Sequence, residues 1–354
     1  MSKQTEGGVM ATKKRIGILT GGGDCPGLNP VIRASVRKGL NEGFEIIGIK
    51  NGWKGLIDNN TEKLGFQSIS GILPKGGTIL GTSRTNPYNN EKDIKKVRQN
   101  IKRLRLHALV AIGGDDTLTV AAKLSQEGYR VVGIPKTIDN DVPYTDTTFG
   151  FDSAINIATE AIDRLHTTAE SHHRVMVVEV MGRHAGWIAL EAGMAGGADY
   201  IVIPEVPLNM NELIGVLKKR KKRGKFFSII VVAEGAKLED KTIVLKDQEK
   251  DAFGHVKLGG IGQRLADKIQ EMTGFETRVT VLGHLVRGGT PSAYDRILGT
   301  RFGVKAIELI MQNKSGYMVS LQGNRIGAVK IEKVLGKTRY VDKELIKIAR
   351  EFFG

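Results

Sequence analysis

The sequence lacks several features that would place it in common classes of protein. Among its 354 residues it has a single cysteine, Cys25, which excludes an internal disulfide framework and leaves a zinc cluster without thiolate ligands. It contains no apolar run of about 18 residues, and its polar, then basic, N-terminus has no apolar signal core. We therefore expect a cytoplasmic protein that makes no membrane contact.

Aromatic residues are also sparse, at 6% of the chain. This matters because the formal net charge of +15 raises the question of nucleic-acid binding. Basic residues gather at 95–105 and 218–225, but no aromatic side chains interleave with these runs as a base-stacking platform requires. In the first run apolar residues recur at helical spacing, which indicates an outer helix with a solvated face. We expect no nucleic-acid partner, and a charge that favours encounter with small anionic substrates.

What is present is typical of a globular α/β protein with room for two domains, with 40% hydrophobic and 26% charged residues. Residues 15–20 predict a strand, followed by three glycines and a helix at 29–41, which is the opening of a βαβ unit. Further buried strands at 45–49, 108–112 and 130–134 predict a four-stranded parallel sheet within 14–135.

The second half predicts another sheet of the same style. Strand-like runs at 174–180, 200–204 and 227–233 alternate with helical patterns at 153–164, 187–193 and 211–223. A short strand at 280–282 and a long helix at 293–312 follow, whereas 237–260 is typical of an inserted loop or hairpin. We expect two doubly wound, Rossmann-like α/β domains with parallel-rich sheets, formed by 14–150 plus 286–336 and by 151–285 plus 337–354.

Three turns follow predicted strands at the edge where parallel sheets bind ligands. The first, 21–27, exposes backbone N–H groups beside a helix N-terminus, which suits a phosphate, but it matches neither the P-loop nor the dinucleotide-binding pattern. Alone, it is explained equally well as a tight β-to-α turn. The acid-rich turns at 113–117 and 135–141 converge on the same edge, and this convergence favours a phosphate site.

The charged residues of these turns suit phosphoryl transfer, in which a protein binds Mg²⁺, neutralises the transferring group and orients an acceptor hydroxyl. Asp115 suits Mg²⁺, and Asp139 suits the base that accepts the hydroxyl proton. Lys136 can stabilise phosphoryl oxygens, and Asp141 would tune or orient Asp139. These four residues form the predicted chemical centre.

Charged side chains further along the chain could bind a sugar phosphate, with arginines and a histidine on the phosphate and Glu234 on the hydroxyls. Each taken alone is more often part of a surface ion pair. A histidine metal site is not supported, because no pair of histidines one helical turn apart has an acidic neighbour. The candidate clamp residues are Arg174, Arg183, Arg278, His284 and Arg287.

Together these motifs resemble those of the phosphofructokinase family from about Arg15 to the C-terminus. The resemblance implies fructose 6-phosphate as acceptor, Asp139 as base and Asp115 on Mg²⁺. It also implies that Arg174 and Arg278 reach the site of a neighbouring subunit, in a homodimer or homotetramer. The matching segments are 21–24, 113–115, 137–141, 150–154, 181–183, 204–205, 282–291 and 294–296. The implied sugar-phosphate residues are Thr137, Met181, Gly182, Arg183, Glu234, His284 and Arg287.

Two positions distinguish the branches of this family. Asp116 and Lys136 stand where its ATP-dependent bacterial members typically have glycine, and the resemblance implies the pyrophosphate-dependent branch. A carboxylate at 116 would repel and exclude the α-phosphate of ATP, whereas Lys136 can reach a smaller donor. Because some ATP users carry this lysine, Asp116 is the stronger discriminator. Arg84 resembles the arginine that contacts donor phosphates, beside Gly22 and Gly23.

The sequence thus predicts reversible, Mg²⁺-dependent phosphoryl transfer from pyrophosphate to the 1-hydroxyl of fructose 6-phosphate. The alternative is an ATP-dependent 6-phosphofructokinase. A second alternative, a non-catalytic phosphosugar sensor on the same fold, is disfavoured because Asp139 is present. A lipid or nicotinamide-dinucleotide kinase would leave Arg183, His284 and Arg287 unexplained.

Overall fold

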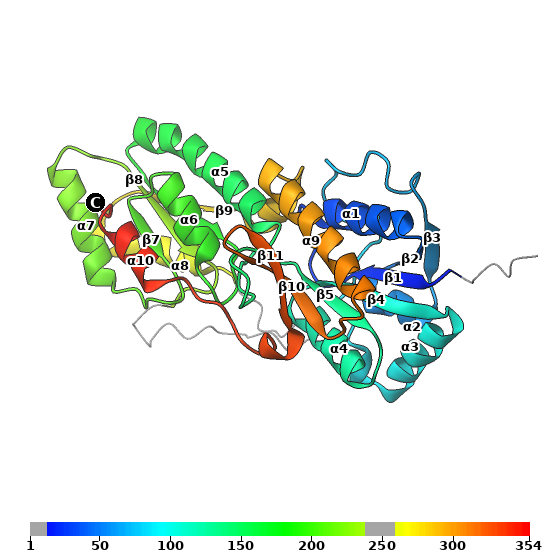
Figure 1. Ribbon diagram of the computed structural model, residues 1–354. Helices are drawn as coiled ribbons and strands as arrows, with labels where there is room; N and C mark the ends of the chain where they lie inside the picture. The colour runs from blue at the N-terminus through cyan, green and yellow to red at the C-terminus, as the bar shows by residue number, and fades with distance from the viewer. Residues whose placement is uncertain (1–12, 238–258) are drawn as a thin grey trace, which may run out of the picture.

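Two mostly parallel β-sheets organise the chain (Figure 1). A computed structural model describes residues 13–237 and 259–354. Among these residues, the larger sheet has seven strands in the order β11-β10-β5-β4-β1-β2-β3, and the smaller has four in the order β7-β8-β6-β9. Figure 1 shows the sheets in opposite halves of an elongated molecule, with α9 near the middle. The expected α/β class is confirmed.

The four parallel strands predicted for the first part of the chain are confirmed as the neighbours β2-β1-β4-β5. Each is a run of buried apolar residues covered by helices, the usual pattern for a parallel sheet. The elements of this part are β1 (Arg15–Thr20), α1 (Leu28–Asn41), β2 (Glu45–Ile49), α2 (Gly52–Asp58), β3 (Thr61–Leu64), η1 (Pro87–Asn89), α3 (Glu91–Arg103), β4 (Leu106–Gly113), α4 (Asp115–Gln126) and β5 (Val131–Pro135).

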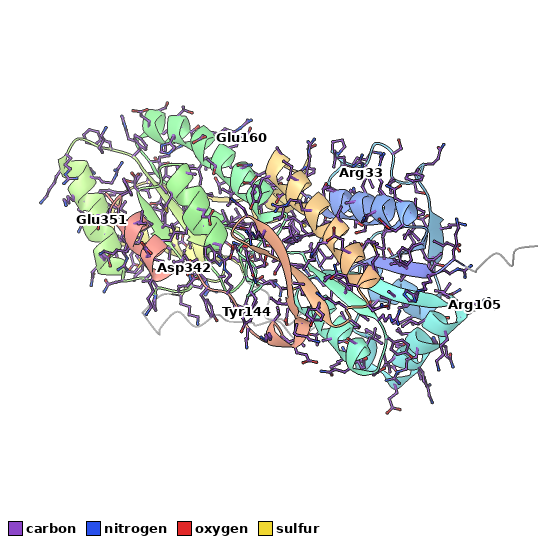
Figure 2. The ribbon with its side chains drawn as sticks, viewed as in Figure 1. Arg33, Arg105, Tyr144, Glu160, Asp342 and Glu351 are labelled. Carbon is purple, nitrogen blue, oxygen red and sulfur yellow. The ribbon has the colours of Figure 1, made fainter. Side chains whose placement is uncertain are left out.

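The basic run at 95–105 forms part of α3, as expected for an outer helix. Its buried residues are Ile94, Val97 and Ile101, so the charged side chains face solvent. Figure 2 shows Arg105, just beyond the helix, at the outer end of the molecule.

Three strands of the larger sheet were missed in the sequence. β3 pairs antiparallel with β2, β10 (Tyr317–Gln322) pairs in parallel with β5, and β11 (Arg325–Lys330) pairs antiparallel with β10. β3 and β11 are edge strands with charged or half-buried residues, so they lack the apolar signal that identifies a central strand. The last part of the chain therefore returns to complete the first sheet.

The smaller sheet is parallel throughout, as predicted. The predicted helix at 153–164 is longer than expected, and β9 begins before the predicted run at 280–282. The remaining elements are α5 (Phe151–His172), β6 (Val175–Val180), α6 (Trp187–Ala195), β7 (Tyr200–Val202), α7 (Met210–Lys222), β8 (Ser228–Ala233), α8 (Ile261–Thr273), β9 (Thr277–Val281), η2 (Gly283–Arg287), α9 (Ala293–Met311), η3 (Ile331–Lys333) and α10 (Lys343–Arg350).

Residues 238–258, most of the predicted insertion, lie outside the described residues. The exact domain limits stay a prediction. Among the described helices, none has the length and apolar character needed to cross a membrane.

Helix α9 packs against α1 and joins the halves of the molecule. A Cβ atom at Gly303 would stand 2.6 Å from the Val31 carbonyl oxygen, so glycine is required for this close approach. One continuous apolar cluster runs from the larger sheet through α1, α9 and α5 to the smaller sheet. The two sheets are therefore held by shared packing rather than by a bare linker.

A buried carboxylate fastens α9 to α5. Asp295 is fully buried, and its Oδ2 accepts hydrogen bonds from the Ser153 backbone N–H at 2.8 Å and the Ser153 hydroxyl at 2.5 Å. Its place at the first turn of α5 also suits the positive end of the helix dipole. Burial nevertheless raises the pKa of the Asp295 carboxyl to about 6.

We expect Asp295→Ala to lower the free energy of unfolding by about 2 kcal/mol at pH 8, because Ser153 loses its buried acceptor. The raised pKa favours the folded state when the carboxyl is protonated, and this contribution is lost as pH rises through 6. The effect of the substitution should therefore be about 1 kcal/mol larger at pH 5 than at pH 8. Urea unfolding at both pH values measures this difference.

The matched control is Asp267→Ala, because Asp267 is an exposed carboxylate on α8 that accepts a hydrogen bond from the side chain of Gln263 at 2.8 Å. It should change stability by less than about 0.5 kcal/mol. An Asp295→Ala effect that is equal at the two pH values would contradict the pKa assignment.

Candidate active site

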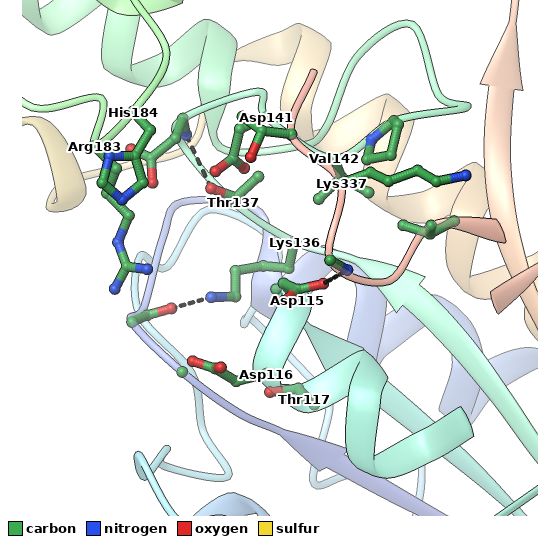
Figure 3. Close-up of a pocket in the computed structure, with 18 of the residues that line it drawn as sticks. Asp115, Asp116, Thr117, Lys136, Thr137, Asp141, Val142, Arg183, His184 and Lys337 are labelled. Atoms are coloured by element: carbon green, nitrogen blue, oxygen red, sulfur yellow. Dashed lines mark hydrogen bonds between the residues drawn. The ribbon is translucent and has the colours of Figure 1, made fainter. Parts of the chain in front are cut away.

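A cavity of about 270 Å³ opens where β1, β4 and β5 end (Figure 3). All three turns predicted to converge at this edge line it. Two further contributions come from distant parts of the chain, the 183–184 turn with Arg287 and the segment that follows η3. The lining residues are Gly22, Gly23, Arg84, 114–117, Lys136, Thr137, Asp139, 141–143, Arg183, His184, Arg287, Val334 and 336–338.

The turns after β1 and β4 approach closely because both contain glycine. A Cβ atom at Gly113 would lie 2.4 Å from Cβ of Thr117, and one at Gly21 would lie 2.5 Å from the Thr117 hydroxyl oxygen. The Gly21 N–H donates to the Ile112 carbonyl at 2.9 Å, and the Lys136 N–H donates to the Gly113 carbonyl at 3.0 Å. Backbone contacts thus set the spacing of all three turns.

The first turn also admits an arginine from the second half of the chain. Gly22 has a φ of +79°, and a Cβ atom at Gly23 would stand 2.8 Å from Nη1 of Arg287. That nitrogen donates to the Asp24 carbonyl at 3.2 Å. Glycine at these positions therefore places a guanidinium against the first turn.

Lys136 ties the third turn to the first. Its side chain is buried, with 4% of the residue exposed, and its ammonium donates to the Gly23 carbonyl, as Figure 3 shows. Burial lowers the pKa of this ammonium group. A cation held this way can turn from a backbone carbonyl to the oxygens of a bound phosphate.

Two carboxylates stand in the first turn of α4, where the helix dipole favours negative charge. Asp115 is exposed at the cavity, and its Oδ1 accepts a hydrogen bond from the Gly336 N–H at 3.4 Å (Figure 3). Asp116 is half-buried and lines the same cavity. The two acids therefore occupy one helix end but differ in exposure.

Asp139 is the most enclosed acid of the third turn. It is 4% exposed, and its Oδ1 has no hydrogen-bond partner among the described residues. Its backbone N–H donates to the Thr137 hydroxyl at 3.0 Å, which fixes the start of the turn. A buried carboxylate oxygen without a partner is costly, and a ligand hydroxyl or a cation would satisfy it.

Asp141 differs electrostatically from its neighbour. Burial, and then the charge of Asp139, raise the pKa of the Asp141 carboxyl to about 7. At neutral pH this carboxyl is partly protonated, so the third turn carries less negative charge than its two acids imply.

The acids of the cavity fit a magnesium ion brought in with a phosphate. Among the described residues, no group of three or more His, Cys, Asp or Glu side chains could hold a metal by itself. Mg²⁺, however, is usually bound through one or two carboxylates together with substrate phosphates. Asp115, exposed at the cavity surface, suits that mode of binding.

The cavity brings together most of the predicted site residues, but six of them are not among its lining residues: Arg174, Met181, Gly182, Glu234, Arg278 and His284. Glu234 Oε1 accepts the backbone N–H groups of Gly182 at 3.3 Å and Arg183 at 3.0 Å, so it supports the turn that carries Arg183. Burial raises the pKa of the Glu234 carboxyl. Met181 precedes this turn, and His284 is an exposed residue of η2.

Arg174 and Arg278 do not line the cavity. Both pair with Glu276, at 2.8 Å and 2.6 Å, beside the edge strand β9. Their predicted role in a neighbouring subunit stays a prediction.

Several lining residues were missed in the sequence. Thr117, Val142, Pro143 and His184 adjoin predicted site residues and could have been found by extending those motifs. The segment 334–338 had no such signal. It reaches the cavity because the chain crosses there from β11 toward α10.

Known proteins resemble this chain over most of its length. The family profile described as Phosphofructokinase matches residues 15–310. A protein from Amycolatopsis methanolica named Pyrophosphate--fructose 6-phosphate 1-phosphotransferase is 54% identical over 341 residues, which cover 96% of this chain and 100% of that protein. A protein from Clostridium perfringens named ATP-dependent 6-phosphofructokinase 2 is 51% identical over 350 residues, which cover 95% and 96%.

Among solved structures, a pyrophosphate-dependent phosphofructokinase from Marinobacter aquaeolei matches with a TM-score of 0.81 at 21% identity. The match covers 96% of this chain and 92% of that chain and bears on the fold alone.

We expect Gly113→Ala to destabilise the protein by about 2 kcal/mol, because the new Cβ would overlap the buried, β-branched Thr117. Adding Thr117→Ala should recover at least half of the loss, since it removes the overlapping atoms. Gly215→Ala is the control: this glycine lies within α7 with nothing near its Cβ position, so alanine should stabilise by about 0.5–1 kcal/mol. Urea unfolding measures the free energy of unfolding of the wild type, the two single variants and the double variant. An absence of recovery in the double variant would refute the proposed overlap.

Proposed function

This chain belongs to the phosphofructokinase family, and on that premise we propose that it transfers a phosphoryl group from pyrophosphate to the 1-hydroxyl of fructose 6-phosphate. The products would be fructose 1,6-bisphosphate and phosphate. The observation that carries the proposal is one cavity lined by Asp116 and Lys136, the residues expected to select the donor, and by Asp139, the expected base. The anhydride bond of pyrophosphate is broken and a phosphate ester is formed on the sugar. Because the anhydride is not much higher in free energy than this ester, the reaction would run in both directions.

Asp139 would act as the base. Its unpartnered Oδ1 is available to accept the proton of the 1-hydroxyl as the sugar oxygen attacks phosphorus. The new bond joins that oxygen to phosphorus, and the bridging oxygen–phosphorus bond breaks, releasing phosphate. Asp141, with its raised pKa, would limit the charge that opposes two anionic substrates.

Pyrophosphate would lie between the first two turns and Lys136. Gly22 and Gly23 present backbone groups, Arg84 adds a guanidinium, and the buried ammonium neutralises charge on the transferring group. Two like charges about 4 Å apart at an effective dielectric constant of 20 repel by about 4 kcal/mol, roughly a thousandfold in binding. Repulsion of that size between Asp116 and an α-phosphate is sufficient to exclude ATP.

Mg²⁺ is the metal proposed for this site, with Asp115 as its protein ligand. When bound, the ion would neutralise charge on the phosphoryl oxygens. The chain itself supplies the position: the Gly336 N–H holds one oxygen of Asp115, and α4 fixes the direction of its side chain.

Fructose 6-phosphate would be bound by Arg183, Arg287 and Glu234, together with Thr137, Met181, Gly182 and His284. Arg174 and Arg278 would contribute from the neighbouring subunit of a dimer or tetramer, held by their shared partner Glu276. The cluster of guanidinium groups suits the recognition of a sugar phosphate.

An ATP-dependent 6-phosphofructokinase is the second candidate, because a relative that is 51% identical carries that name. The half-buried carboxylate of Asp116 in the donor region favours pyrophosphate. A sensor without catalysis is disfavoured by the buried, unpartnered Asp139.

The donor is identified by measuring turnover with pyrophosphate and with ATP at equal Mg²⁺. We expect turnover with pyrophosphate alone, and we expect Asp116→Gly to gain ATP-dependent turnover of at least tenfold over wild type. Asp116→Asn, which removes the charge at constant volume, separates repulsion from steric exclusion. Efficient ATP use by the wild type without pyrophosphate activity would refute the donor assignment.

Asp139→Asn should lower kcat by about 10²–10⁴-fold, because it removes the base. The affinity for fructose 6-phosphate, measured by calorimetry, should change by less than about threefold. Asp163→Asn, an exposed acid on α5, serves as the control. Unchanged turnover in Asp139→Asn would assign the base elsewhere.

A further inference from the structure

The segment 339–341, between β11 and α10, is bonded to the turn that carries Asp139. The Arg339 N–H donates to the Asp141 carbonyl at 2.8 Å, and Nη1 of its guanidinium donates to the Asn140 carbonyl at 3.4 Å. The backbone and side chain of one residue therefore hold the carbonyl groups of the two residues that follow the base.

Arg339 is itself held from the opposite side by the smaller-sheet half of the molecule. Its guanidinium carbon lies 4.1 Å from the ring centroid of Trp187, the first residue of α6. The indole N–H donates to the Arg339 carbonyl at 2.9 Å. Trp187 is 3% exposed, so the stacked pair is enclosed, where a cation–π contact is strongest.

The same segment has a second anchor two residues on. The Val341 N–H donates to Glu205 Oε1 at 3.1 Å, and this carboxylate also accepts the Gly186 N–H at 2.9 Å. The crossing segment is thus also tied to the loops around α6 just after it contacts the catalytic turn.

The catalytic turn needs such support. Asn140 is 2% exposed and has a φ of +52°. This left-handed conformation costs free energy, so contacts with the surrounding residues must stabilise it. Asn140 stands in the sequence between two acidic residues, Asp139 and Asp141. Its side-chain oxygen accepts the Thr148 N–H at 3.1 Å, whereas its carbonyl is held by Arg339.

The positive charge of Arg339 interacts with acidic residues outside the catalytic turn. Asp342, Asp146 and Glu191 offset the burial that lowers the pKa of its guanidinium. The contacts that Arg339 makes with the turn are hydrogen bonds to neutral carbonyls. Its part in the site is therefore geometric.

We propose that Arg339 is a positioning residue that holds the Asn140–Asp141 peptide, and through it Asp139, against Trp187. This inference rests on the proposed function of Asp139 as the base. It adds to the requirements for turnover a residue far along the chain that is not among those lining the cavity.

The first test is kinetic. Arg339→Ala should lower kcat by about 10–100-fold, because small displacements of a reacting group have effects of that size. KM for both substrates should change by less than about threefold. Millimolar guanidinium should restore part of the lost kcat, whereas methylammonium at equal ionic strength should not. A kcat equal to wild type, or a loss confined to KM, would overturn the proposal.

The matched control is Lys330→Ala, which removes another cation from an aromatic ring, that of Tyr317 at 4.3 Å, outside the cavity. It should leave kcat unchanged. If Arg339→Ala fails to fold, Arg339→Lys replaces it. Lysine keeps the charge but not the planar fork, so its kcat should stay at least threefold below wild type, and full activity would overturn the positioning role.

The second test does not depend on activity. Amide hydrogen exchange in a peptide covering 136–150 should become faster in Arg339→Ala, and to a smaller extent in Trp187→Phe, at an unchanged thermal midpoint. Unchanged exchange in both variants would overturn the proposal whatever the enzyme does. A wild type inactive with both donors would instead refute the proposed function, and the exchange result would still stand.

Discussion

The close approach of three backbone turns at the carboxyl edge of the larger sheet is the constraint on which the site depends. Thr117 leaves no room for a Cβ atom at Gly21 or Gly113, and the Gly23 carbonyl receives the ammonium of Lys136. Strands β1, β4 and β5 are neighbours, so packing of their buried apolar residues sets the distance between the turns. The packed strands of the core therefore position the side chains of these three turns.

Burial at this edge of the sheet disfavours the charged forms of its ionisable side chains. Burial, and then the nearby charge of Asp139, raise the pKa of Asp141 to about 7, while burial lowers the pKa of Lys136. An anion and a cation that enter together supply these side chains with partners of opposite charge. A site of this kind suits substrates that bring their own charge, as phosphates do.

The two halves of the molecule cooperate because the chain crosses between them more than once. Asp295 fastens α9 to α5, and the segment 339–341 joins the catalytic turn to Trp187 and Glu205. In the proposed reaction the donor and acceptor lie on different halves, so these contacts maintain the alignment of the reacting groups. Rigid packing at the junction would serve turnover directly.

The α/β class, the central parallel strands and the three acid- or glycine-rich turns follow from the sequence alone, because each is a local pattern whose place in a parallel sheet follows from general rules. The sequence also assigned 286–336 to the first domain, but the tertiary structure was needed to show that this segment adds β10 and β11 beside β5 and that 334–341 closes the site. Arg339 and Asn140 are separated by about two hundred residues in the sequence. No local periodicity predicts a contact between residues so far apart. The position of Arg339 depends on the packing of the two halves, which exists only once the whole core has formed.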